Sequence, residues 1–107
     1  MISQKDYCDY TTGHDLMMLG LEPGPYYDSC HSILLYDAQK FLREDKHIEV
    51  VVLGENEIGG PYYADIYTEN GYAGYVRESF DCYEDALAEG IKEVVNMLKN
   101  PELYENN

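Results

Sequence analysis

The sequence predicts an α+β fold: a two-layer sandwich in which helices pack on one face of a three-stranded antiparallel sheet. An apolar stripe at 3.6-residue spacing over residues 83–99 predicts a long amphipathic helix. A run rich in β-branched residues at 47–53 and a second run at 61–68 predict two consecutive strands. Asn70-Gly71 is typical of a type I′ turn and predicts a tight hairpin to a third strand.

Two further helices precede the strands. The segment 11–20 predicts a short helix, capped by Thr11 or Thr12. A second amphipathic pattern over 34–46 predicts a longer helix, with Ser32 available to begin it. The expected order is therefore an αβββα core preceded by a short N-terminal helix.

The final helix follows a third strand expected at 72–79. Asp81 or Cys82 is the expected N-cap, and Asp81 with Glu84 predicts a capping box. Gly90 lies inside the apolar stripe, where it costs about 1 kcal/mol relative to alanine. We attribute it to a close approach between this helix and the sheet.

Alternation along the first two strands assigns their side chains to two faces. We expect the core under the helices to contain Ile48, Val50, Val52, Tyr62, Ala64 and Ile66. The opposite face, which no predicted helix covers, would carry Glu49, Val51, Leu53, Tyr63, Asp65 and Tyr67. This second set is either an ordinary sheet surface with cross-strand aromatic pairs or an interface. The interface would serve a partner or, most simply, a two-fold homodimer.

The chain length of 107 residues suits one domain. We divide it into an N-terminal helix and loop segment at 1–31, the αβββα core at 32–99 and a tail at 100–107. Residues 1–21 lack a basic start and a long apolar run, so we expect no signal peptide. The three cysteines are widely spaced, which favours free thiols in a reducing, cytoplasmic compartment.

Acidic residues dominate the charge. Asp and Glu number 21 against 7 Lys and Arg, for a net charge of −14. This balance disfavours direct binding to nucleic acid, which needs cations against phosphates, and to anionic membranes. A partner with a basic surface, or simple solubility, remains.

The sequence shows no pattern for catalysis or for a bound cofactor. Cys30-His31 is adjacent, and no CxxC, HxxxH or HExxH spacing supports a metal site. Cys82 precedes a helix N-terminus, a position that can lower the pKa of a thiol and make it reactive. We interpret Cys82 instead as a residue at the start of the helix without a catalytic role. We therefore expect no enzyme activity, no metal and no cofactor.

The final helix carries a row of carboxylates. Like charges four residues apart on a helix are mildly unfavourable. The row is therefore either a solvated face of the helix or a site that presents negative charge as nucleic acid does. Its members are Asp81, Glu84, Asp85, Glu89 and Glu93.

Segments 35–44, 48–52, 62–67 and 83–91 resemble a group of small acidic proteins of gut Bacteroidales and their phages or integrated elements. The most distinctive stretches are AQK-aromatic-LRE and YE-A-EGI. The resemblance implies a phage-type accessory protein and carries over no functional residue.

The αβββα order also resembles double-stranded RNA-binding domains. Those domains place lysines at the start of their second helix to hold phosphates. Here that position reads Tyr83-Glu84-Asp85, which would repel RNA.

The leading hypothesis is an accessory protein that acts by protein–protein interaction, as an inhibitor or decoy of a basic, nucleic-acid-binding host protein. The alternative is a protein that binds or sequesters a small molecule, through its tyrosine-rich face or the Tyr26-Tyr27 loop. A purely structural role is the third hypothesis.

Overall fold

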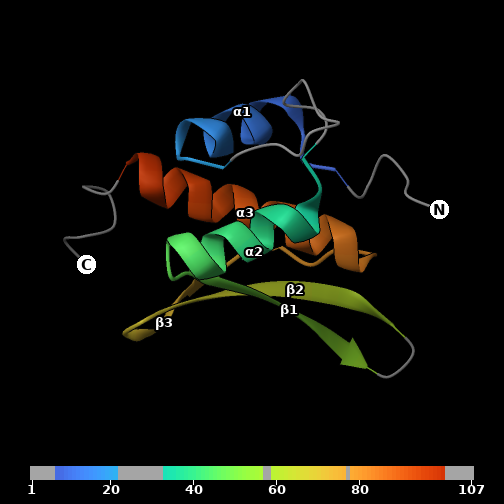
Figure 1. Cartoon of the computed structure of the whole chain (residues 1–107). Helices are drawn as coiled ribbons and strands as arrows, with labels where there is room; N and C mark the ends of the chain where they lie inside the picture. The colour runs from blue at the N-terminus through green and yellow to red at the C-terminus, as the bar shows by residue number, and fades with distance from the viewer. Residues whose placement is uncertain (1–6, 22–32, 57–58, 77, 101–107) are drawn as a thin grey trace.

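The computed structural model describes residues 7–21, 33–56, 59–76 and 78–100. Its elements are α1 (Tyr10–Met18), α2 (Leu35–Asp45), β1 (Glu49–Asn56), β2 (Gly59–Thr68), β3 (Gly71–Tyr75) and α3 (Tyr83–Lys99). The strands form one antiparallel sheet in the order β1-β2-β3. Helices α2 and α3 cover one face of it (Figure 1), which confirms the predicted α+β fold.

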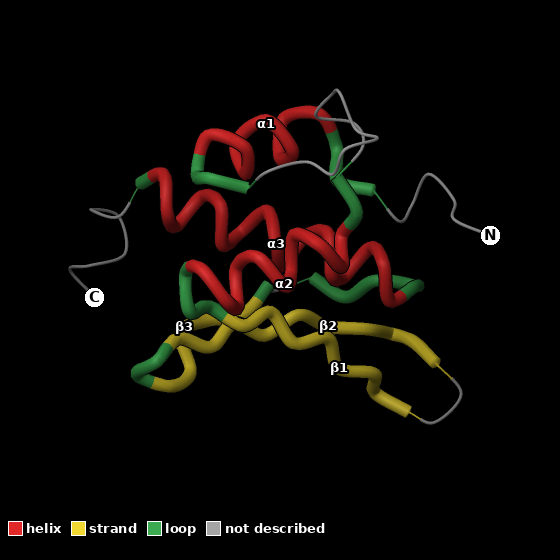
Figure 2. Tube along the Cα trace, in the orientation of Figure 1, coloured by secondary structure: helices red, strands yellow, loops and turns green. Residues whose placement is uncertain are grey.

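The core lies between the sheet and α3. Val50 pairs with Ile66 and Val52 pairs with Ala64, so that the predicted inner set does share one face. Val50, Ala64 and Ile66 are buried, and they meet the buried stripe of α3. Figure 2 shows the strands as a single layer below the two long helices.

Gly90 lies where α3 comes closest to the sheet. A Cβ atom at this position would lie 2.5 Å from Val50 Cγ1 and 3.0 Å from the Cβ of Ala64. The close approach expected from the sequence is therefore confirmed. Only a residue without a side chain allows the helix backbone to rest on the strands at this point.

Helix α1 forms a further layer on the side of α3 that faces away from the sheet (Figure 1). Its Leu16 is fully buried. Lys99 Nζ lies 3.1 Å from Asp15 Oδ2 and joins the end of α3 to α1. This pair is exposed on the lysine side and contributes little, so apolar packing holds α1 in place.

The N-cap predicted for α1 was wrong. The helix begins at Tyr10, and the Asp9 carboxylate accepts a hydrogen bond of 2.7 Å from the Thr12 amide. That bond holds the pKa of Asp9 below its usual value. Asp9, rather than Thr11 or Thr12, is the N-cap, because aspartate accepts this bond as well as threonine does.

The starts of the two long helices lack side-chain caps. The N-cap of α2 is Leu34, while the predicted cap, Ser32, lies outside the described residues. Cys82 is the N-cap of α3, and its side chain makes no capping bond. The capping box predicted from Asp81 and Glu84 therefore does not begin this helix, which tertiary packing stabilises instead.

The hairpin between β2 and β3 forms where it was predicted, but its turn is not type I′. Thr68 pairs with Gly71, and a type I′ turn would need positive φ at both Glu69 and Asn70. Among the described residues, His47 alone is a non-glycine with positive φ. Gly71 instead adopts a positive φ of 108°, which it can do because it has no Cβ atom to clash with the backbone.

Strand β3 ends at Tyr75, short of the predicted limit at residue 79. Pairing nevertheless continues along the same edge of β2. The Val76 amide donates to the Ala64 carbonyl at 2.9 Å, and Phe80 forms an isolated antiparallel bridge with Tyr62. The chain therefore follows β2 until shortly before α3 begins.

Candidate interaction surface

The face of the sheet away from the helices gathers every residue predicted for it. The register pairs Glu49 with Tyr67, Val51 with Asp65 and Leu53 with Tyr63. We call this surface, together with Tyr72, the outer sheet face. Its members are Glu49, Val51, Leu53, Tyr63, Asp65, Tyr67 and Tyr72.

No helix lies over the outer sheet face in the part of the chain that the structure describes (Figure 1). Leu53 is 47% exposed, Tyr67 is 37% exposed and Tyr72 is 57% exposed. Val51 and Tyr63 are half-buried beside them. These side chains form a partly apolar, aromatic surface next to carboxylates, a composition that is typical of interfaces.

Tyr72 belongs to this surface although its strand pattern did not indicate it. The register shifts between Ile66, which pairs with Gly74, and Tyr67, which pairs with Tyr72. The extra residue, Ala73, is a bulge that turns Tyr72 to the outer face. The rings of Tyr67 and Tyr72 meet edge to face, with centroids 5.5 Å apart. Strict alternation of side chains along a strand cannot reveal a bulge.

Two residues of the outer sheet face are acidic. Glu49 Oε2 lies 3.8 Å from Arg43 Nη1 and accepts no hydrogen bond from any residue that the structure describes. Asp65 makes no ion pair with any residue that the structure describes. The surface therefore has one carboxylate with a cation nearby and one without, on a chain whose net charge is −14.

The acidic row of α3 is less continuous than its spacing predicted. Asp81 and Asp85 are exposed, whereas Glu84, Glu89 and Glu93 are half-buried. The exposed Lys92 lies one helical turn from Glu89 and shares its face. A cation thus interrupts the negative charge along the helix.

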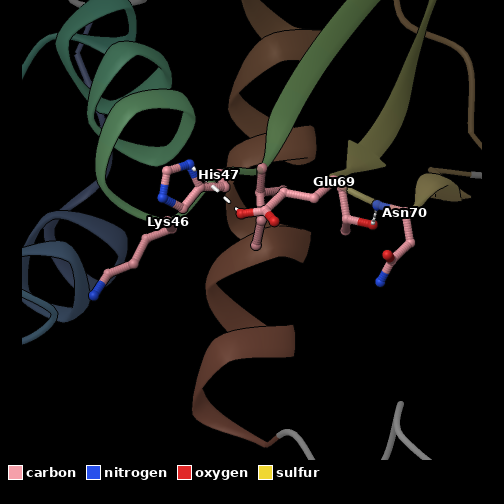
Figure 3. A pocket seen from close by; sticks show the side chains of 6 residues that line it. Lys46, His47, Glu69 and Asn70 are labelled. Carbon is pink, nitrogen blue, oxygen red and sulfur yellow. Dashed lines mark hydrogen bonds and ion pairs between the residues drawn. The ribbon is translucent and has the colours of Figure 1, made fainter.

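A hollow of about 250 Å³ lies at the end of the sheet where α2 leads into β1 (Figure 3). Lys46, His47, Ile48, Thr68, Glu69 and Asn70 line it. His47 Nδ1 lies 3.7 Å from Glu69 Oε1, and both side chains are largely exposed. Lys46 extends away from that pair (Figure 3). Exposed charges of this kind are well hydrated and do not form an enclosed ligand pocket.

Cys8 and Cys82 are free thiols, and Cys30 lies outside the described residues. Burial, with the nearby Asp9 as a smaller cause, raises the pKa of Cys8 to about 12. Within the described ranges, no three His, Cys, Asp or Glu side chains lie close enough to hold a metal ion.

We expect iodoacetamide at pH 8 to modify Cys82 much faster than Cys8 in the folded protein. Only about one Cys8 thiol in ten thousand would be ionised at that pH, and the thiolate is the reactive form. Cys82 is half-exposed at the start of α3. Peptide mass spectrometry after timed labelling measures both rates, and labelling in guanidinium is the control that should equalise them. Equal rates in the folded protein would contradict the burial of Cys8.

Comparison with protein-family models, with curated proteins and with solved structures finds no match. None of the described helices is long and apolar enough to cross a membrane.

Proposed function

We propose that this protein acts by protein–protein interaction and binds a partner with a basic surface through the outer sheet face. The observation that carries the proposal is the exposure of Leu53, Tyr67 and Tyr72, which are spread along the outer sheet face on either side of Asp65. Aromatic side chains supply large contact areas at little entropic cost, and they are enriched among the residues that dominate binding energy.

Charge favours a foreign, cationic partner over a second copy. Two copies would bring together chains of net charge −14 each, with Glu49 and Asp65 of both at the contact. Like charges opposite one another across an interface are unfavourable. A surface rich in Lys and Arg would instead gain from both carboxylates and would associate faster through electrostatic steering.

An inhibitory role follows if the partner uses the same basic surface to hold nucleic acid. Occupation of that surface by an acidic protein would exclude the nucleic acid. The resemblance to phage-type accessory proteins would make the partner a host protein. The small-molecule alternative used the tyrosine-rich face or the Tyr26-Tyr27 loop, and that loop lies outside the described residues. The alternative has less support because the hollow at Lys46 and Glu69 is lined by exposed charges.

We predict that the double substitution Leu53→Ser and Tyr67→Ser abolishes partner capture while the fold is retained. Each removes part of an exposed apolar contact, for an expected loss of about 1–2 kcal/mol per side chain, so that the two together lower the affinity by about thirtyfold or more. The measurement is affinity capture from host lysate at low and high salt, with quantitative mass spectrometry. The captured amount of a partner that binds through charge should also decrease at high salt, because salt shortens the screening length.

The matched control is the variant in which Glu84→Gln, Asp85→Asn, Glu89→Gln and Glu93→Gln are combined. It removes four charges from α3 and leaves the sheet unchanged. We expect it to keep partner capture, with slower association because less negative charge steers the encounter. If this variant lost its partner and the sheet variant kept it, the site would lie on α3. Sedimentation as a dimer, abolished by the sheet substitutions, would identify a second copy as the occupant.

A further inference from the structure

The free edge of the sheet lies along β1. The Gln39 side chain donates a hydrogen bond of 2.8 Å to the Val50 carbonyl, so this carbonyl points away from β2. Ala64, which pairs with Val52, uses its carbonyl toward β3 by accepting from the Val76 amide. Because the two groups of a residue point to the same side of an antiparallel strand, Val52 also directs its amide and carbonyl to the open edge.

Gly54 extends the same row. Its partner Tyr62 exchanges two hydrogen bonds with Phe80, at 2.8 and 2.9 Å, on the β3 side. The backbone amide and carbonyl groups of Val52 and Gly54 therefore point away from β2, and no described residue bonds to them. Gly54 is exposed and Val52 is half-buried, so another backbone can approach. Such an edge is a template for an added strand.

We propose that the partner contributes an extended, Lys/Arg-bearing segment that pairs with β1 as a fourth strand and lays its side chains along the outer sheet face. This inference rests on the proposed function and specifies the partner chemistry. Pairing with Val52 and Gly54 would satisfy four backbone groups. Apolar side chains opposite Val51 and Leu53 would extend the exposed surface, and a cation would lie opposite Glu49.

Charge argues against a second copy of this chain at the edge. A second β1 strand would bring together two chains of net charge −14 at an edge that carries Glu49. Like charges across an interface are unfavourable. A basic segment would instead place a cation near Glu49.

Gln39 limits the open edge at one end. Its bond occupies the Val50 carbonyl, which would otherwise be the next acceptor for an added strand. We therefore expect Gln39→Ala to strengthen binding of an added strand by a few-fold, because one more acceptor becomes available. A partner held by charge alone would be indifferent to this substitution.

The test uses the capped peptide Lys-Thr-Val-Thr-Val-Thr-Lys as the probe. In the antiparallel register, its last lysine lies opposite Glu49, and its first two threonines lie opposite Gly54 and Val52. Two matched probes carry two N-methyl groups each, either on those threonine amides or on the two valine amides. All three have the same charge and the two methylated forms have the same mass. Titration followed by NMR measures affinity and hydrogen exchange at the Val52 amide.

We expect the parent and valine-methylated probes to slow exchange at Val52, and the threonine-methylated probe to bind at least about fivefold more weakly. Equal binding by all three would show attraction without strand pairing, which would overturn this inference and leave the proposed function standing. Failure of every probe to bind would also overturn it. The capture experiment with Leu53→Ser and Tyr67→Ser would then decide the proposed function separately.

Discussion

Replacement of Ile91 by aspartate is expected to unfold the protein, and Leu87→Asp should do the same. Both side chains are fully buried in the stripe of α3 that faces the sheet and α2. An unpaired carboxylate there costs several kcal/mol, which is comparable to the roughly 5–15 kcal/mol that stabilises a typical domain. Thermal unfolding followed by circular dichroism measures the effect.

The matched control introduces the same side chain on the other side of the helix. Asn96 is exposed on α3, so that Asn96→Asp adds a carboxylate which stays hydrated. We expect its midpoint to remain within a few degrees of the parent, because exposed substitutions change stability by about 0.5 kcal/mol or less. If Ile91→Asp melted like Asn96→Asp, the assignment of the buried stripe would be wrong.

Periodicity predicted the parts of the fold that burial determines. The 3.6-residue stripe of α3 and the alternation of β1 and β2 each place apolar side chains on one side, and both patterns match the observed core. The ends of elements were less predictable. Asp9 and Thr12 both have oxygen atoms suited to capping, and only the local path of the chain determines which of them accepts the bond.

The outer sheet face was predictable for the same reason, since residues that alternate with a buried set must share the opposite face. Tyr72 escaped prediction because a one-residue bulge reverses the alternation within β3. The sequence pattern did not predict which backbone groups of β1 are free at the open edge. That depends on which backbone groups face β2, and the bond from Gln39 to Val50 reveals that orientation.

Alanine in place of Gly90 should destabilise the protein, although alanine is the better helix former. Helix propensity alone would stabilise the variant by about 1 kcal/mol. The added Cβ would meet Val50 Cγ1 at 2.5 Å, a separation that forces the helix or the strand to move. Overpacking of this kind costs about 1–3 kcal/mol, so we expect a net loss of up to about 2 kcal/mol. Chemical denaturation measures it.

A double-mutant cycle with Val50→Ala separates the steric clash from other effects. Val50→Ala alone leaves a cavity and should destabilise the protein, but it also removes the methyl group that the new Cβ would meet. Gly90→Ala should therefore cost less in that background, with a coupling energy of about 1 kcal/mol or more. Gly74→Ala is the control, because its Cβ would have no neighbour within 4 Å. A stabilising effect of Gly90→Ala in the parent would show that α3 can rise from the sheet without loss of packing.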